Sequence, residues 1–272
     1  MIFAAVLRSE AYHMARRDRQ WFEPTRPIAR AILCFLLLGP ASARAATPPS
    51  GPVLEAWKDV TTFHEDLARI DRARDLLEAQ VARQPTLEAL LLLAWAHLIW
   101  ADYRAPTIEA KLASYERGRD VAKRAIDMAP RNPEAHLWYA ANLGRWAITK
   151  GKLRAAFLLS TLKQEVQTVL DIDPNHVPGL SLAGSLYLEI PGMFGGDVPR
   201  AEGYQRKALS LDPHFTRARL ELARCLIELG RYDEARAELK RVIDERQPSY
   251  IADWVMRHRP TAERLLAEIR AK

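Results

Sequence analysis

The stretch Ala208-Leu-Ser-Leu-Asp-Pro213 is a variant of Val169-Leu-Asp-Ile-Asp-Pro174 and of Ala125-Ile-Asp-Met-Ala-Pro130. In each copy an apolar helix face ends at a proline, whose ring keeps the preceding residue out of the helical region and removes a hydrogen-bond donor. The prolines at 85, 130, 174, 213 and 248 are spaced by 45, 44, 39 and 35 residues. Self-similarity at this period predicts an array of stacked antiparallel helical hairpins.

Helical periodicity continues along the chain, and no segment alternates as a strand does. One hairpin of about 35 residues buries too little apolar surface to fold alone, so the units must stack. The sequence predicts an all-α solenoid in residues 53–272, with about four units plus terminal helices. We expect helices over 53–64, 66–84, 86–103, 107–129, 133–149, 152–173, 177–189, 198–211, 215–229, 232–246 and 260–271.

The last units follow the spacing of tetratricopeptide (TPR) repeats, which they resemble. In the last unit but one, large, small and aromatic residues recur on a first helix, and two alanines lie seven residues apart on a second. Small residues at these places let the two helices of a hairpin approach closely. The residues concerned are Leu180, Ala183, Gly184, Tyr187, Ala201 and Ala208.

A leader precedes the repeats. Five arginines between 16 and 30 are followed by the apolar run 31–38 and by the small residues Ala41-Ser-Ala-Arg-Ala-Ala46, an order typical of a secretion signal. Eight apolar residues fall well short of the roughly 20 that span a bilayer, which disfavours a retained anchor, although that alternative stays open. We expect a signal over 1–45, starting at Met1 or Met14, a linker over 46–52, and a periplasmic or secreted mature protein.

The charge of the chain comes mainly from this leader. Residues 1–45 hold seven arginines and three acidic residues, so their removal lowers the formal net charge from +6 to +2. No basic stripe with interleaved aromatic residues remains, which argues against nucleic-acid binding. Cys225 is the one cysteine after the leader and excludes an intramolecular disulfide. Its place on a first helix indicates packing rather than reactivity.

The segment Leu87–Ala101 is apolar on nearly every side. Such a helix must be covered all round. It is either a central helix packed between its neighbours, or a helix with one face on an apolar groove. In the second case Trp100, Tyr103, Leu137 and Trp146 would line the groove, because ligand pockets are mostly apolar and aromatic.

The loop Pro191-Gly-Met-Phe-Gly-Gly-Asp197 joins two helices of one unit. Gly195 and Gly196 permit backbone angles that are closed to other residues, and Asp197 fits the N-cap of the next helix. We expect Phe194 to pack back into the core. With no following Lys-Ser or Lys-Thr and no preceding strand, the glycines (Gly192 among them) do not make a phosphate loop.

At this loop and the following helix, up to Asp212-Pro213, the chain resembles the TPR proteins related to the T component of TRAP transporters, over most of 66–270. That resemblance implies a non-enzymatic, periplasmic or surface-associated protein that partners solute-binding proteins and has an apolar ligand path. A shorter likeness, around His136 to Trp146, is to helical-repeat regulators of microtubule dynamics. It agrees poorly with a bacterial-style signal, so we expect the first family.

The sequence contains no recognisable catalytic motif and no set of metal ligands. We therefore expect no enzyme activity and no cofactor. Ser160-Thr-Leu-Lys163 matches Ser-x-x-Lys but lacks the partner motifs of penicillin-recognising enzymes. His176 and His214 follow closing prolines, without further ligands at metal spacing. A hydrolase with an unrecognised site is the remote alternative, and a general envelope scaffold is the nearer one.

By the resemblance, the first helices of the repeats line a concave face that binds protein partners, and one end is apolar while the other is basic. That gradient would suit an apolar or amphipathic ligand, or a peptide with an acidic end. The candidate groove comprises Leu92, Ala96, Ile99, Trp100, Leu137, Ala141, Arg145, Trp146, Ser181, Ser185, Leu188, Arg217, Leu220 and Arg224.

The leader generates a direct prediction. If residues 1–45 are a cleaved signal, mass spectrometry of the protein purified from its host gives an N-terminus at or near Ala46, because the small residues before it fit a signal peptidase site. An intact Met1 or Met14 terminus in the cytosol would contradict export.

Overall fold

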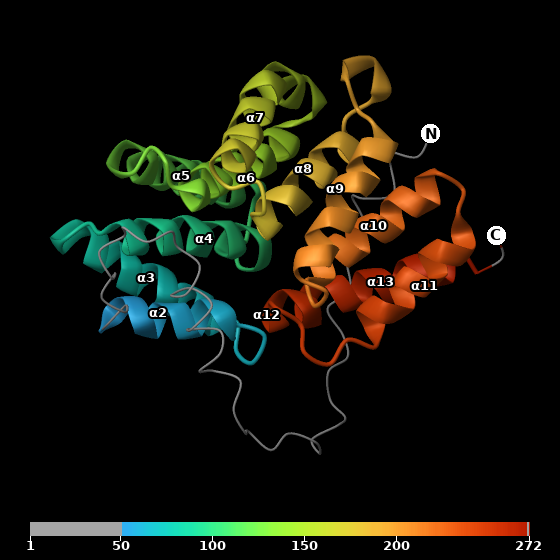
Figure 1. Cartoon of the computed structure of the whole chain (residues 1–272). Helices are drawn as coiled ribbons and strands as arrows, with labels where there is room; N and C mark the ends of the chain where they lie inside the picture. The colour runs from blue at the N-terminus through green and yellow to red at the C-terminus, as the bar shows by residue number, and fades with distance from the viewer. Residues whose placement is uncertain (1–50, 271) are drawn as a thin grey trace. The chain divides into compact units, whose positions relative to one another are not determined.

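The computed structural model describes residues 51–270 and 272 (Figure 1). The expected signal over 1–45 and almost all of the linker lie outside these residues. The described chain is helical throughout its regular elements, which confirms the predicted fold class. Its helices are α2 (Pro52–Thr61), α3 (Ala68–Arg83), α4 (Leu87–Tyr103), α5 (Ile108–Met128), α6 (Pro133–Lys150), α7 (Lys152–Ile172), α8 (Val177–Glu189), α9 (Val198–Leu211), α10 (Thr216–Glu228), α11 (Tyr232–Ile243), α12 (Ile251–Asp253) and α13 (Arg259–Glu268). Short turns of other helix types lie at Gly192–Phe194 (η2) and Trp254–His258 (η3).

The recurring prolines end helices as the sequence predicts. Gln84, Ala129, Asp173 and Asp212 each precede a proline, and each has an extended ψ between 79° and 97°. In the two Asp-Pro copies the carboxylate also accepts a hydrogen bond from the backbone N–H two residues on, at 2.9 Å. The aspartate side chain therefore stabilises the turn that follows the end of the helix.

Side chains cap the next helix after most turns. Thr86, Thr107, Asn132 and Asp197 each accept a hydrogen bond from the backbone N–H three residues later, at 2.9–3.2 Å. His176 does the same for α8 through Nδ1, at 3.1 Å. Each cap pairs a donor that the first helical turn leaves free.

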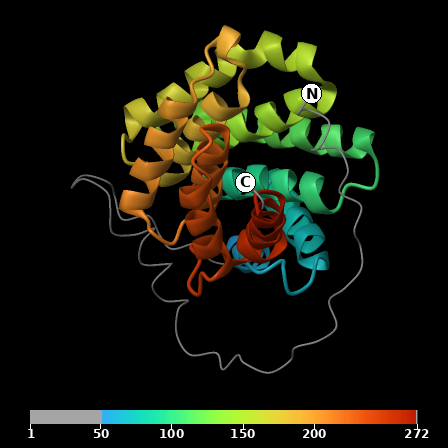
Figure 2. The ribbon, with the colours of Figure 1, turned by 90° about the vertical axis from the view of Figure 1, so that its right-hand side faces the viewer.

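Successive hairpins stack through their first helices. Helix α2 contacts α4, α4 contacts α6, α6 contacts α8, α8 contacts α10, and α10 contacts η3 (Figures 1 and 2). We call the side formed by these first helices the inner surface. Small residues set the spacing of helices both within and between hairpins. A Cβ on Gly184 of α8 would overlap the side chain of Gln205 of α9, and a Cβ on Gly118 of α5 would overlap that of Asn142 of α6. The predicted role of Gly184 in close helix packing is confirmed.

Helix α4 is the most deeply packed element. It contacts α2, α3, α5 and α6, and it contributes most of its apolar side chains to the core cluster of the first two hairpins. The packed-helix alternative for 87–101 accounts for this burial. No helix within residues 51–270 is both long and apolar enough to cross a membrane.

The segment 251–258, for which the sequence predicts no helix, forms α12 and the π-helical turn η3, which continue directly into α13. Ala252 is buried in the core cluster of the first hairpins, and Met256 packs against the same cluster. Tyr250, just before α12, makes edge contacts with the rings of Trp95 and Phe215 at 6.0 and 5.7 Å. The C-terminal helix therefore returns to the inner surface at α4.

The 190–197 loop corrects two expectations. Phe194 does not return to the core: it is half-exposed, and Met193 is almost fully exposed. Gly195 has a φ of +85°, as expected, but Gly196 is needed for space, because a Cβ there would overlap the carbonyl oxygen of Ile190.

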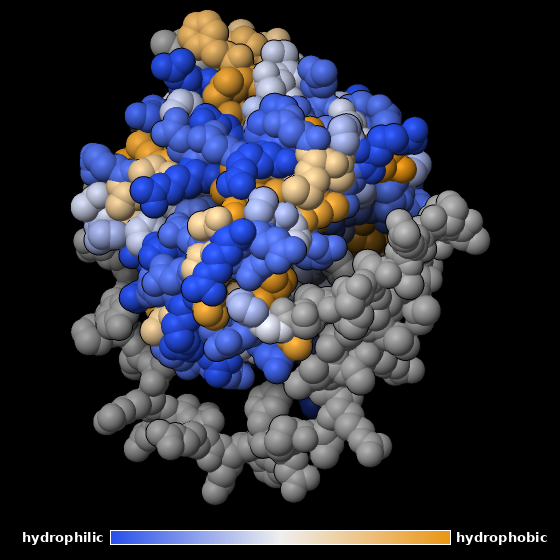
Figure 3. All heavy atoms as spheres, turned by 90° about the vertical axis from the view of Figure 1, so that its left-hand side faces the viewer, coloured by the Kyte–Doolittle hydropathy of each residue, from blue (hydrophilic) through white to orange (hydrophobic). Residues whose placement is uncertain are grey.

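In Figure 3 polar residues cover most of the face shown. Apolar side chains gather at its top edge, which is at the height of the α6–α7 turn in Figure 1.

The loop geometry predicts a difference between two glycines. Gly196→Ala should lower the free energy of unfolding by about 1–3 kcal/mol, because the added methyl group displaces backbone. Gly192→Ala is the matched control, since a Cβ at Gly192 meets no atom within 4 Å. Urea denaturation of both variants checks this, and equal stabilities would contradict it.

Candidate basic cluster on the inner surface

Asp102, near the end of α4, is the centre of a charged group on the inner surface. Its side chain is 6% exposed. Oδ2 accepts hydrogen bonds from Arg145 of α6 at 2.7 Å and from Arg257 of η3 at 2.5 Å. The Tyr115 hydroxyl donates to Oδ1, and Lys111 Nζ lies 4.0 Å from the same oxygen.

These partners decide the ionisation of Asp102. Burial by itself would raise its pKa, but the charges of Arg145 and Arg257, with the hydrogen bond from Tyr115, hold that pKa well below its usual range. Asp102 is therefore ionised at neutral pH. Its negative charge in turn adds to the burial that raises the pKa of the Tyr115 hydroxyl, so Tyr115 stays a donor.

Two further charges lie in the same place. Burial lowers the pKa of Arg217, against the opposing charge of Glu221, and burial raises the pKa of Asp253. The charges of Arg145 and Arg257 lower the pKa of Arg217 further, and they offset in part the effect of burial on the pKa of Asp253. The Arg257 guanidinium also lies 5.2 Å from the ring centre of Tyr103. We call Lys111, Arg145, Arg217 and Arg257, with Asp102 and Asp253, the basic cluster. Its four cations outnumber its two carboxylates.

A second charged group follows along α10 and is balanced. Arg224 donates to Glu221 at 2.8 Å and to Glu189 of α8 at 2.5 Å. Burial would lower the pKa of Arg224, but these two carboxylates raise it. Arg224 joins two helices and has no excess charge to offer a ligand.

The structure sorts the candidate groove residues into separate environments. Arg145 and Arg217 meet in the basic cluster, while most of the uncharged residues lie in the contacts between helices. Ser185 donates to the Ser181 carbonyl within its own helix, at 2.9 Å. The buried residues are Leu92, Ala96, Ile99, Leu137, Ser181 and Leu220, and the partly exposed ones are Ala141, Ser185 and Leu188.

The two tryptophans of the candidate groove face other neighbours. Trp100 donates from Nε1 to Asp71 of α3 at 2.7 Å, and Arg74 lies over its ring. Trp146 has Lys150 and Arg154 over its ring, at the α6–α7 end. The structure does not bring Trp100, Leu137 and Trp146 together with the basic cluster.

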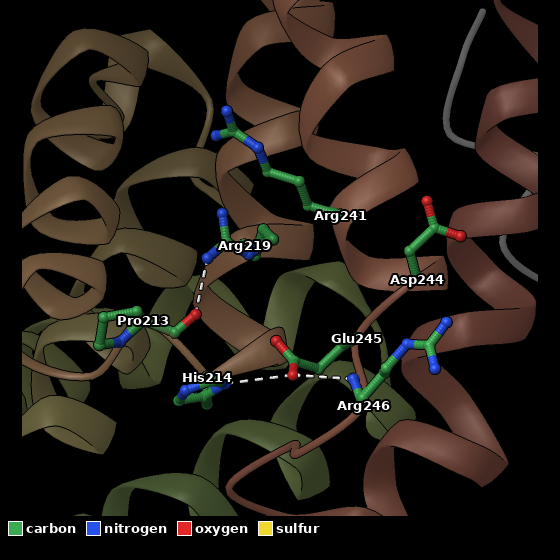
Figure 4. A pocket seen from close by; sticks show the side chains of 7 residues that line it. All are labelled: Pro213, His214, Arg219, Arg241, Asp244, Glu245 and Arg246. Carbon is green, nitrogen blue, oxygen red and sulfur yellow. Dashed lines mark hydrogen bonds and ion pairs between the residues drawn. The ribbon is translucent and has the colours of Figure 1, made fainter.

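A polar hollow of about 390 Å³ lies outside the inner surface, between the 212–215 turn and the loop after α11 (Figure 4). Arg219 donates to the Pro213 carbonyl at 2.6 Å and to Glu238 at 2.8 Å. Glu245 accepts from His214 at 3.1 Å and from backbone N–H groups, which hold its pKa below the usual value despite burial. These contacts fix the loop after α11 to the turn.

Other chemically notable side chains are structural. Burial raises the pKa of the Cys225 thiol to about 12, which confirms packing over reactivity. Burial lowers the pKa of His97 to about 4 and that of His258 to about 3, so both rings are neutral. Within residues 51–270 no three His, Cys, Asp or Glu side chains gather as a metal site.

The sequence predicts Arg145 and Arg217 as site residues but not Asp102 and Arg257. These two lie 155 residues apart along the chain, so no local pattern links them. The sequence contains one signal: Asp102 is a carboxylate directly after the apolar segment 87–101. A buried carboxylate requires paired cations.

The pairing predicts a pH-dependent loss in Asp102→Asn. Removing one partner of a fully buried ion pair costs about 3–5 kcal/mol. Arg145 and Arg257 are partly exposed and keep part of their hydration, so the free energy of unfolding of the variant at pH 7 should fall by about 3 kcal/mol or less. The lowered pKa of Asp102 stabilises the fold above its unfolded pKa of about 4. The gap between variant and wild type should therefore narrow as pH falls below about 4.

Urea denaturation at pH 7 and pH 3 measures this gap. Asp127→Asn is the control, because Asp127 pairs with Lys123 on the exposed side of α5, where such pairs contribute little. A gap that stays the same at both pH values would contradict the assignment.

Two family models and several solved structures are similar to this chain. Residues 195–253 match the model described as Tetratricopeptide repeat, and residues 58–193 match the one described as Regulator of microtubule dynamics protein 1-3. A crystal structure of a thermophilic TPR protein from Thermus thermophilus is 18% identical, with a TM-score of 0.61, over 82% of this chain and 100% of that one. MamA from Desulfovibrio magneticus is 14% identical, with a TM-score of 0.42, over 71% and 93%. No curated protein matches.

These matches revise the family expected from the sequence. None of them supports the likeness to TRAP transporter T components, whereas the shorter likeness around His136 to Trp146 falls inside the matched range 58–193. That range is half of the chain. The chain belongs to the regulator of microtubule dynamics protein 1-3 family, and its residues 195–253 form a tetratricopeptide repeat.

Proposed function

We propose that the chain is a non-catalytic binding module that holds an acidic group of a protein partner at the basic cluster. The observation that carries the proposal is the excess of cations there: Lys111, Arg145, Arg217 and Arg257 surround Asp102 and Asp253. Proteins with TPR folds bind partners through such stacked helices. A carboxylate from a partner would balance the charge.

Exposure and pairing single out two cations for contact with a partner. Arg145 is partly exposed even though it pairs with Asp102. Arg217 makes no ion pair within 4 Å to any described residue, and burial lowers its pKa. A guanidinium that is poorly hydrated and unpaired gains most from an added carboxylate, which it meets with two parallel hydrogen bonds.

The location and the identity of the partner follow as further parts of the proposal. The leader supports export, and then the partner would be a periplasmic protein, such as a solute receptor of a TRAP-type transporter, or a component of a general envelope scaffold. An apolar or amphipathic ligand would have to enter beside α4. A hydrolase with an unrecognised site remains the remote alternative.

The family match favours a second candidate. The matched family is described by a role in microtubule dynamics, and the match spans 58–193, which includes Asp102 and Arg145. In this candidate the acidic partner is a microtubule or a microtubule-bound protein. Co-sedimentation with assembled tubulin tests it, and cell fractionation separates it from an exported protein.

The basic cluster predicts charge-dependent peptide binding. A fluorescein-labelled peptide of alternating Glu and Leu should bind the wild-type protein, and added salt should weaken the complex. Arg217→Gln and Arg145→Gln should each weaken it about tenfold or more, because each removes a hydrogen bond between charged groups. Fluorescence anisotropy measures both effects.

Arg264→Gln is the matched control, since Arg264 pairs with Glu268 on the exposed side of α13. It should bind the peptide as the wild type does. Circular dichroism confirms that each variant is folded. Failure of the folded wild-type protein to bind the peptide at low salt, or an equal loss in Arg264→Gln, would contradict the proposal.

A further inference from the structure

We propose that the edge of the molecule at the α6–α7 turn and the 190–197 loop docks on the surface of a membrane rich in anionic lipid. The proposal is independent of the partner site, because this edge lies on other residues. It rests on four exposed apolar side chains, on the cations near them, and on the absence of aspartate and glutamate from residues 146–164 around the α6–α7 turn.

The apolar side chains are unusually exposed for their size. Phe157 of α7 is 71% exposed and Ile148 of α6 is 63% exposed. From the neighbouring loop, Met193 is 84% exposed and Phe194 is 51% exposed. Turns within successive hairpins lie along one edge of a stacked array, and Figures 1 and 2 both place these two at the top of the molecule. We call these four residues the apolar edge.

A direct contact joins the two parts of the apolar edge. Lys163 of α7 donates from Nζ to the Phe194 carbonyl oxygen at 3.1 Å. The loop therefore lies beside α7. Its fold is fixed by Gly195 and Gly196 and by the Asp197 cap of α9, so Met193 and Phe194 are held outward by a defined turn. The space-filling view shows apolar side chains at this top edge (Figure 3).

The sequence around the α6–α7 turn carries only positive charge. Residues 146–164 contain four cations, at 150, 152, 154 and 163, and no aspartate or glutamate. Lys150 and Arg154 both lie over the Trp146 ring, at 5.7 and 6.0 Å. Two acidic residues flank the loop, and both have partners: Asp197 caps α9, and Glu189 accepts a hydrogen bond from Arg224 at 2.5 Å.

An anionic membrane surface matches this combination. Aromatic and aliphatic side chains enter the boundary between headgroups and acyl chains, tryptophan prefers that boundary, and lysine and arginine attract acidic headgroups. A second copy that met this edge through its own apolar edge would present the same positive charge and would be repelled. An anionic surface avoids that repulsion, and charge therefore favours the membrane as the occupant.

Vesicle flotation of the full-length protein tests the proposal. The wild type should bind vesicles of phosphatidylglycerol and phosphatidylcholine and should bind much less to phosphatidylcholine alone. Phe157→Ser combined with Phe194→Ser should reduce binding about tenfold or more, and so should Lys150→Glu combined with Arg154→Glu. Met128→Ser is the matched control, because Met128 is 50% exposed but lies at the opposite end of α5, next to a turn between hairpins.

Hydrogen exchange separates this edge from any binding by the leader. Vesicles of the anionic mixture should protect peptides covering 146–158 and 190–196. Equal binding by the wild type and both double variants, or protection elsewhere alone, would overturn the proposal. Self-association of the wild type that Phe157→Ser abolishes, without vesicle binding, would assign the edge to a second copy instead.

Discussion

The structure depends on one buried carboxylate. Asp102 belongs to the second hairpin, and its two arginine partners come from the third hairpin and from the C-terminal helix. A charge taken out of water must be paired, or the fold loses several kcal/mol. Asp102 therefore fixes where the C-terminal helix meets α4. Without the Arg257 contact, that helix would be held on this side mainly by the packing of Tyr250, Ala252 and Met256.

This closure divides the inner surface into two parts. Ala252 and Met256 cover apolar side chains near α4, in the region where an apolar ligand path was expected. The polar part keeps Arg145 partly exposed and leaves Arg217 without an ion pair within 4 Å among the described residues. The same contact that stabilises the array thus favours a charged partner over an apolar ligand. This is the physical reason for proposing an acidic group.

The sequence predicts local features and misses distant ones. Prolines after Gln84, Ala129, Asp173 and Asp212 end helices by local sterics, so the helix boundaries were predictable. The 251–258 helix was missed because Pro260 follows closely, which reads as a break, and because a π-helical turn does not keep the 3.6-residue period. Phe194 was placed in the core because aromatic residues usually are buried, whereas the turn geometry points it outward.

Two surfaces of this array differ in what they contribute to folding. Asp102 and Arg257 both hold hairpins together and form the basic cluster, so substitutions there change stability and binding at once. Phe157 and Met193 are largely in water, so the fold gains little from them. A large apolar side chain that does not stabilise the fold, placed among cations, is best explained by a second surface that it contacts. Stacked hairpins allow this separation, because each unit packs only against its neighbours and its turns remain free.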